Sequence, residues 1–238
     1  PLEVSRFLKL MAQVCSGLQS AHQGVLIENK LYCVVHRDIK PSNIFITHNQ
    51  SLGEIAKVLD FGISDLFQRN DQAKEQLAMG TLAYSSGEQL KNQPPDPRSD
   101  IYSLGITMFE ALTGQLPILP EQQTLRGWVD AHCHQQPRKI SEVAPRLQIP
   151  KALDELIQSC LAKDIEKRPQ NIGECLNVLK SLIASSNEGL ASLSSEESVE
   201  DILDGIINGP EFSTPILASN STKFSEVSLT DQAWRVSW

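Results

Sequence analysis

One short stretch constrains this chain more than any other part of it: residues 34–46, with the sequence VVHRDIKPSNIFI. An apolar pair opens the stretch and an apolar triplet closes it. Between them stand five polar residues at fixed offsets: His36, Arg37, Asp38, Lys40 and Asn43. At an average usage of roughly one in twenty per position, five such residues coincide by chance about once in a few million windows. The stretch therefore predicts a loop with a specific chemistry.

A second motif, Asp60-Phe61-Gly62, follows shortly downstream and carries one further carboxylate. We predict short strands at residues 34–35, 44–46 and 55–59, so that a strand–turn–strand unit brings Asn43 and Asp60 close together. Carboxylate and amide oxygens are the ligands that Mg²⁺ prefers. A single Asp or Asn is most often a turn or cap residue, but the joint pattern favours a metal site.

Together these two motifs resemble the H-R-D-L-x-x-x-N catalytic loop and the D-F-G turn of protein kinases. The lysine two residues after Asp38 is typical of the serine/threonine kinases. The resemblance implies a mainly α fold, the large (C-terminal) lobe of a kinase, with a small pair of β-hairpin strands at the cleft and no small N-terminal lobe. It also implies a protein serine/threonine kinase that uses ATP and Mg²⁺ and acts on Ser or Thr hydroxyls of protein substrates.

The same resemblance assigns roles to the residues of the predicted cleft. Asp38 would accept the proton of the substrate hydroxyl, and Lys40 would lie on the transferring phosphate. Asn43 and Asp60 would hold Mg²⁺. Phe45 would form the floor under the adenine, and Leu59 would lie beside the nucleotide. Thr81 matches the threonine that bonds the catalytic aspartate and favours hydroxyl over phenol substrates.

Other residues match positions that support the site in kinases: His36, Arg37, Glu88, Asp100 and Arg168. Residues 80–88 resemble the end of the activation segment, with Ser86-Gly87-Glu88 in place of A-P-E. The missing proline should cost about 0.4–1 kcal/mol of local order. Asp100 would hold the backbone of the catalytic loop, and Arg168 would pair with Glu88 to clamp the activation segment.

Arg37 matches an arginine that receives an activating phosphate in related kinases. Between Asp65 and Gly80, however, this chain has no Ser, Thr or Tyr. We therefore predict activation without phosphorylation in that stretch, with Asp71 or Glu75 supplying the negative charge.

Apolar periodicity predicts helices over residues 1–23, from Arg98 to the glycine cap at Thr113-Gly114, over 153–161 and over 172–183. Ser99 or Asp100 is expected to cap the second of these, and residues 24–32 are expected to form a loop. The cluster His132-Cys133-His134 carries metal-ligating residue types, but three neighbours in a row do not converge easily on one tetrahedral ion. A polar loop or a helix end is the favoured interpretation.

Composition separates a body from a tail. The net charge is −8, and from Ser186 onward nine acidic residues stand against two basic ones, which leaves 20 acidic and 19 basic residues before that point. No basic patch for nucleic acid and no membrane-spanning run is found. Five cysteines without a C-x-x-C pair indicate a reducing compartment, so a cytoplasmic location is expected.

These observations divide the chain into a partial kinase domain at residues 1–184 and an acidic, Ser-rich, largely disordered tail at 185–238. A possible amphipathic helix at 195–208 could bind a partner. No G-x-G-x-x-G motif is present, so the chain alone is expected to have negligible activity. A non-catalytic binding or scaffold module derived from a kinase, or an inactive remnant, remains the alternative.

Overall fold

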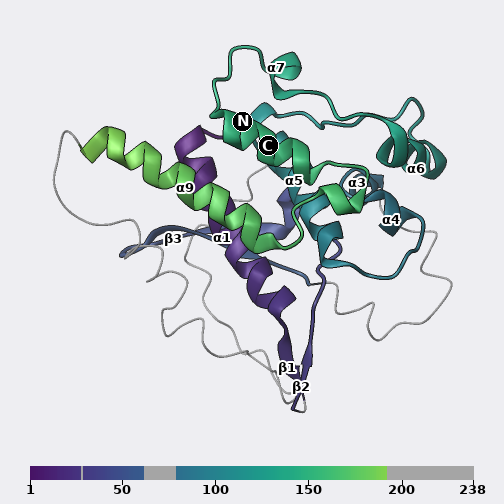
Figure 1. Cartoon of the computed structure of the whole chain (residues 1–238), viewed down its shortest axis with the longest axis horizontal. Coiled ribbons are helices and arrows are strands. Elements are labelled where there is room, and N and C mark those ends of the chain that lie inside the picture. Colours follow the sequence, from purple (N-terminus) through teal and green to yellow (C-terminus); the bar gives the residue numbers. More distant parts are fainter. Residues whose placement is uncertain (28, 62–78, 192–238) are drawn as a thin grey trace, which may run out of the picture.

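The computed structural model describes residues 1–27, 29–61 and 79–191. The longer helices are α1 (Val4–Gln23), α5 (Pro97–Thr113), α6 (Leu125–His134), α8 (Lys151–Cys160) and α9 (Ile172–Ala191). The shorter ones are η1 (Pro41–Asn43), α3 (Met79–Leu82), α4 (Gly87–Leu90), α7 (Ile140–Val143) and η3 (Ile165–Lys167). The strands are β1 (Val25–Ile27), β2 (Lys30–Tyr32), β3 (Ile44–Asn49) and β4 (Gly53–Val58), in two antiparallel pairs. Figure 1 shows this mainly helical arrangement, as the sequence predicts.

Helix α1 forms where the apolar periodicity predicts a helix. The carboxylate of Glu3 caps its first turn by accepting hydrogen bonds from the backbone N–H groups of Ser5 and Arg6, both at 3.0 Å. The helix ends at Gly24, whose φ of 118° is a conformation that favours glycine. One face of α1 is buried and packs along α9.

Helix α5 lies at the centre of the molecule and is buried nearly all round, including polar residues such as Ser99, Asp100 and Ser103. The cap predicted at Ser99 or Asp100 was wrong. The chain enters the helix at Asp96, whose side chain accepts a hydrogen bond from the Arg98 N–H, and Pro97 occupies the first turn. The predicted end is correct: Gly114 closes the helix in the left-handed conformation, with a φ of 73°.

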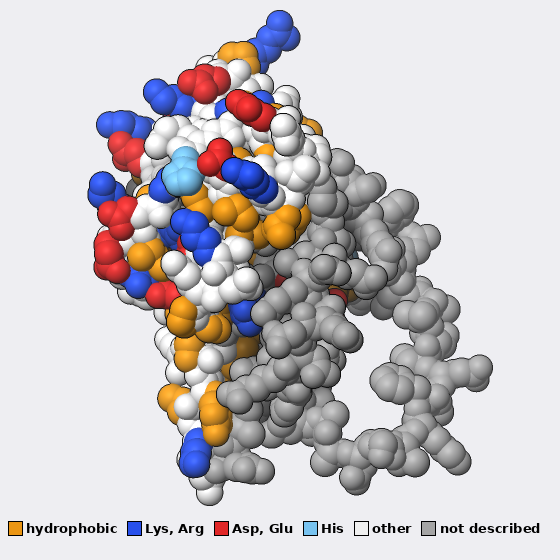
Figure 2. Space-filling model, turned by 90° about the vertical axis from the view of Figure 1, so that its right-hand side faces the viewer, with side chains coloured by type: hydrophobic (Ala, Val, Ile, Leu, Met, Phe, Trp, Pro, Cys, Tyr) orange, Lys and Arg blue, Asp and Glu red, His pale blue; other side chains and the backbone are white. Residues whose placement is uncertain are grey.

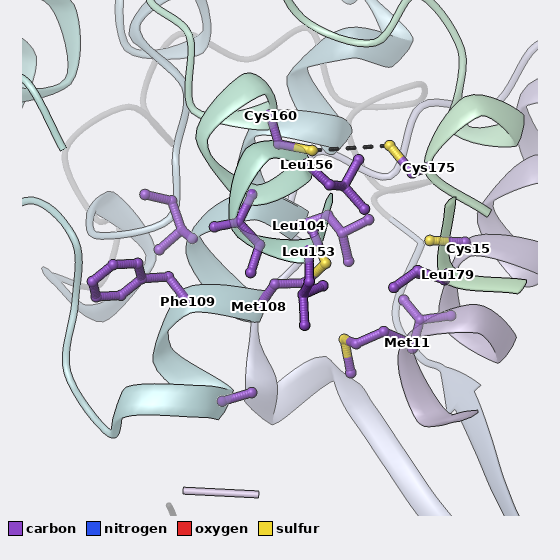
Figure 3. Packing of buried hydrophobic residues seen from close by; sticks show 14 of the residues in the cluster. Met11, Cys15, Leu104, Met108, Phe109, Leu153, Leu156, Cys160, Cys175 and Leu179 are labelled. Atoms are coloured by element: carbon purple, nitrogen blue, oxygen red, sulfur yellow. Dashed lines mark hydrogen bonds between the residues drawn. The ribbon is translucent and has the colours of Figure 1, made fainter. Parts of the chain in front are cut away.

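The core is built between α1, α5, α8 and α9 (Figure 3). Its fully buried side chains include Met11 and Cys15 from α1, Leu104, Met108 and Phe109 from α5, Leu153 and Cys160 from α8, and Cys175 and Leu179 from α9. The thiols of Cys160 and Cys175 are 3.9 Å apart, a contact between free cysteines. This core gives the residues at the ends of α1 and α5 fixed positions.

The hairpin β3–β4 packs against α1. Asn43 directly precedes its first strand, and Asp60 follows shortly after its second strand. Ile44 pairs with Val58 at the open end, and Asn49 with Gly53 at the turn. Ile44 and Ile46 contact the core. The strand expected at residues 34–35 does not form, because that segment hydrogen-bonds to the end of α1 instead, through the Val34 N–H and the Ala21 carbonyl.

Residues 24–32, expected as a loop, contain the second hairpin, β1–β2, which projects from the lower end of the molecule (Figure 1). Gly24 makes it possible, because a Cβ at this position would lie 2.6 Å from Cγ of Leu31. Figure 2 shows several hydrophobic side chains on the surface of this projection. In the β1–β2 hairpin, Leu26 and Leu31 are 57% and 66% exposed. Strands this short carry too little periodicity to be predicted.

Helix α5 approaches the end of α8 closely at Gly105, and a substitution there tests the packing. A Cβ at Gly105 would lie 2.8 Å from Cβ of Cys160. Gly105→Ala is therefore expected to lower the free energy of unfolding by about 1–3 kcal/mol, because the two helices must separate. Urea unfolding followed by circular dichroism measures this change.

Gly17→Ala is the matched control, since Gly17 also lies inside a helix and its added Cβ would meet only Cγ2 of Val58, at 3.8 Å. This variant should be stabilised by about 0.5–1 kcal/mol through helix propensity. Equal effects at the two glycines would contradict the steric explanation.

Helix α9 continues to Ala191, past the domain boundary predicted at residue 184. The helix predicted at 195–208 lies outside the described residues, so its formation and its partner remain predictions. Among the helices that the structure describes, none has the length and apolar character needed to span a membrane.

Candidate functional site

The candidate site is built around a buried carboxylate on α5. Asp100 accepts hydrogen bonds from the backbone N–H groups of His36 and Arg37, both at 2.7 Å. Its Oδ2 atom also lies 2.8 Å from Nε2 of His22, at the end of α1. The Asp100 side chain is fully buried. Arg37 has a φ of 69°, a strained conformation for a residue with a side chain, and the two hydrogen bonds hold it there.

His36 connects the loop to the end of strand β4. Its Nε2 atom lies 2.8 Å from the Leu59 carbonyl, and its Nδ1 atom accepts the Asp38 N–H at 3.2 Å. These partners require the tautomer with the proton on Nε2. The ring also packs against Phe61, with centroids 4.7 Å apart. His36 therefore connects the backbone at Asp38 to the backbone at Leu59.

Four of the predicted site residues form one hydrogen-bonded group. Nζ of Lys40 lies 2.7 Å from Oδ2 of Asp38 and donates a hydrogen bond to Oγ1 of Thr81 at 2.9 Å. Nδ2 of Asn43 donates to the Asp38 carbonyl at 2.7 Å and to Asp38 Oδ2 at 2.9 Å. The structure thus brings the loop and the end of the activation segment together through Lys40.

Asp60 follows directly on this group. The Leu59 N–H donates to the Asn43 carbonyl at 2.8 Å, so Asp60 is one residue beyond the point where the hairpin closes. Its φ of 56° is again in the left-handed region, and its side chain is exposed. Asp38, Asn43 and Asp60 therefore lie in one region of the molecule.

Two oxygen atoms of this group, Oδ1 of Asn43 and Oδ1 of Asp38, accept no hydrogen bond from the described residues and are suited to bind a cation and a hydroxyl. The Asn43 amide uses its nitrogen twice, which leaves its Oδ1 as an acceptor. Oδ1 of Asp38 is buried, and no donor of the described residues reaches it. A buried carboxylate oxygen without a partner is costly unless a ligand supplies a donor. The residues present therefore fit Mg²⁺ at Asn43 and Asp60, and a hydroxyl at Asp38.

Two predicted nucleotide contacts lie on the β3–β4 hairpin or directly after it. Phe45 is half-buried on β3, opposite Lys57, and strand alternation places it on the face away from the core that Ile44 and Ile46 contact. Leu59 follows β4 and is 39% exposed. Their roles toward adenine remain predictions.

The activation segment is anchored by an ion pair across 80 residues of sequence. Arg168 donates to both carboxylate oxygens of Glu88, at 2.5 and 3.1 Å, and its side chain is almost fully buried. Ser99 donates to the same carboxylate at 2.9 Å. Burial alone would raise the pKa of Glu88, but the hydrogen bonds and charge of Arg168 outweigh it, and the pKa is lowered.

Two residues that position the site were missed from the sequence. His22 is the third partner of Asp100, and nothing in the local pattern of α1 distinguishes it from an ordinary helix-end histidine. Gln89 donates from Nε2 to the Arg37 carbonyl at 2.9 Å, which ties α4 to the catalytic loop. The spacing of Ser86 and Gln89, which form a capping box, was the available signal for Gln89.

A chain of polar groups lies behind the activation segment. Lys163 donates to the Tyr102 hydroxyl at 3.2 Å, and that hydroxyl lies 2.9 Å from Nδ1 of His132. The His132 ring stacks on Trp128, with centroids 5.4 Å apart. The segment predicted as a polar loop or helix end is the last turn of α6, and His132 within it is buried. Burial, with the nearby charge of Lys163, lowers the pKa of His132 to about 4.

This shift predicts a loss of stability in mild acid. An unfolded histidine with its usual pKa of 6.5 takes up a proton before the folded one does. The free energy of unfolding should therefore fall as the pH falls from about 6.5 toward about 4, by up to about 1.4 kcal/mol per pH unit from this residue. His132→Gln should show a smaller fall than the parent protein in urea unfolding at two pH values in this window. Parallel pH profiles would contradict the assignment.

The negative charges predicted to replace an activating phosphate, Asp71 and Glu75, lie outside the described residues. Thr81 lies within them and is the partner of Lys40. Among the described residues no group of His, Cys, Asp and Glu side chains has the arrangement of a three-ligand metal site.

Comparison with known proteins identifies the relatives of this chain. A family model described as "Protein kinase domain" matches residues 2–180. Serine/threonine-protein kinase A from Synechocystis is 45% identical over 184 residues, which cover 77% of this chain and 35% of that protein. Serine/threonine-protein kinase Pkn1 from Myxococcus xanthus is 34% identical over 186 residues, covering 77% of this chain and 25% of that protein.

Solved structures show the same fold. The kinase domain of PknI from Mycobacterium tuberculosis aligns with a TM-score of 0.51 and 23% identity, over 76% of this chain and 56% of that one. The chain thus spans little more than half of that domain, and about a quarter to a third of the two curated relatives.

Proposed function

Because this chain belongs to the protein kinase family and matches its bacterial serine/threonine members, we propose that it forms the catalytic lobe of an enzyme that transfers the γ-phosphate of ATP to Ser or Thr hydroxyls of proteins. The observation that carries this proposal is the arrangement of Asp38. One of its carboxylate oxygens is held by Lys40 and Asn43, and the other is buried without a donor. Such an oxygen is suited to accept the hydrogen of an incoming hydroxyl.

The remaining residues act by orientation and charge. Asn43 is held in one orientation by its two hydrogen bonds to Asp38, so its Oδ1 and the Asp60 carboxylate are the oxygens that would hold Mg²⁺. Lys40 has three N–H donors, two of which meet Asp38 and Thr81, so one remains for a phosphate oxygen. When bound, Mg–ATP supplies the phosphoryl group, and catalysis rests on positioning and charge neutralisation.

The proposal is tested by assaying phosphate transfer from radiolabelled ATP to a basic test protein. The assay uses a protein that carries this chain behind a nucleotide-covering lobe. We expect Mg²⁺-dependent label on serine and threonine, not on tyrosine, in the hydrolysed product. The chain alone should show no transfer. Absence of any transfer by the longer protein, with ATP and Mg²⁺ in excess, would favour the alternative of a non-catalytic binding module.

A further inference from the structure

A pocket of about 260 Å³ lies on the side of the lobe where α4, the end of α6 and the connection from α8 to α9 meet. Its lining includes Lys91, Cys133, Lys163 and Asp164, together with the Glu88–Arg168 pair. Most of these side chains are polar, and they come from three segments far apart in the sequence. The Glu88–Arg168 pair anchors the segment before it, but no residue proposed to contact ATP, Mg²⁺ or the substrate hydroxyl lines this pocket.

The unusual group in the pocket is the ammonium of Lys163. Within residues 1–27, 29–61 and 79–191, its one hydrogen bond goes to the Tyr102 hydroxyl at 3.2 Å, and it lies 5.5 Å from the centre of the Tyr102 ring. Among the described residues no carboxylate pairs with it. Desolvation, with the nearby charge of Arg168, lowers the pKa of Lys163 to about 8. A half-buried cation with unused donors and no counter-ion costs free energy that an anionic ligand would offset.

The two acidic groups of the pocket are already engaged. Glu88 is neutralised by Arg168 at 2.5 Å. The Asp164 carboxylate accepts the Glu166 N–H at 3.1 Å and caps η3, and Asp164 is exposed to solvent. Lys91, which also lines the pocket, is exposed and makes no ion pair with a described residue. Lys91 and Lys163 therefore line the same space, and neither makes an ion pair with a described carboxylate.

We propose that this pocket is a binding site for a small anion of the phosphate-monoester class. At neutral pH such a group carries nearly two negative charges and three acceptor oxygens, which match two lysines with unused donors. The pocket is somewhat smaller than the range of about 300–1,000 Å³ for drug-sized ligands. It therefore suits a phosphate group with a short organic part.

Occupation of the site would act on the activation segment through contacts already described. Tyr102 connects Lys163 to His132, and Trp128, which stacks on His132, packs against Leu82 and Ala83. These two residues follow directly on Thr81, the partner of Lys40. A ligand that draws the Lys163 ammonium away from Tyr102 would thus change the packing next to the catalytic group.

Cys133 provides a direct measure of binding, because its thiol lines the pocket and is half-buried. In a Cys33→Ser background, which removes the exposed thiol, the rate of Cys133 alkylation by iodoacetamide is followed by mass spectrometry. Inorganic phosphate and O-phosphoserine are titrated against sodium chloride of equal ionic strength. We expect saturable protection by both anions, and half-saturation at a lower concentration for O-phosphoserine if the organic part contributes.

Lys163→Met should raise the half-saturation concentration at least about tenfold, a loss of about 1.4 kcal/mol or more. Lys167→Met is the matched control, since Lys167 is exposed on the same connection but does not line the pocket. Lys91→Met should weaken protection as well, and it serves if the Lys163 variant fails to fold. No saturable protection, equal protection by chloride, or equal effects of the Lys163 and Lys167 variants would overturn the proposal.

Discussion

Asp38→Asn is expected to lower kcat for phosphate transfer by about 10²–10⁴-fold, the usual contribution of a positioned acid or base. An asparagine can still accept hydrogen bonds from Lys40 and Asn43 through its oxygen, so the loop should keep its shape. What it loses is the carboxylate oxygen that faces no donor in the structure. The measurement is the initial rate at saturating Mg–ATP, made with the protein that carries both lobes.

The prediction is specific because kcat should fall while the KM for ATP stays nearly the same. The KM for ATP should change little, because Asp38 is assigned to the hydroxyl and not to the nucleotide. Asp130→Asn is the control, since Asp130 is an exposed aspartate on α6 whose side chain is 78% accessible. A rate within about threefold of the parent would remove Asp38 from its proposed role.

The second large effect concerns stability. Arg168→Met should lower the free energy of unfolding by about 3–5 kcal/mol, because it leaves the Glu88 carboxylate buried without its counter-ion. Arg168 also donates to the carbonyls of Ala162 and Arg98, at 2.8 and 3.1 Å, and its guanidinium lies 4.7 Å from the Tyr102 ring centre. Urea unfolding at neutral pH measures the change.

A double-mutant cycle separates the ion pair from these other contacts. Glu88→Gln combined with Arg168→Met should cost less than the sum of the single changes, with a coupling of about 1–3 kcal/mol. Lys151→Met supplies the control, because the Lys151–Glu155 pair is exposed (89% and 63%) and should contribute less than about 0.5 kcal/mol. Additive single effects would show that the ion pair itself contributes little.

The parts of the fold that could be predicted are those with a strong local signal. Helix α1 and the end of α5 follow from apolar spacing and a glycine cap, and β3–β4 follows from apolar runs on either side of a turn. The N-terminus of α5 could also have been predicted, since Asp at the N-cap followed by Pro at the first helical position is a common helix start. The expectation of a cap at Ser99 or Asp100 overlooked that signal, whereas the expected contact of Asp100 with the backbone of the loop is present.

The contacts of Asp100 with the loop backbone and of Arg168 with Glu88 were expected from the resemblance to kinases, but the other contacts between distant segments could not be predicted. Asp100 meets His22 across 78 positions of sequence, and Arg168 meets Arg98 and Tyr102 as well as Glu88. The pocket with Lys163 requires three elements to meet, so no single stretch carries its signal. The hairpin β1–β2 depends on Gly24 leaving room for Leu31, a steric fact that a sequence pattern does not express.

Gly87 stands where the A-P-E motif has proline, and the structure shows what surrounds this position. The sequence suggests only a loss of order at this position, but in the structure a Cβ on Gly87 would lie 2.9 Å from Sγ of Cys133. The thiol of Cys133 on α6 thus occupies the space that a side chain at position 87 would need. An alanine, or the proline that the A-P-E motif has here, would have to move that thiol aside. The size of the side chain at position 133 therefore sets how much room a residue at position 87 has.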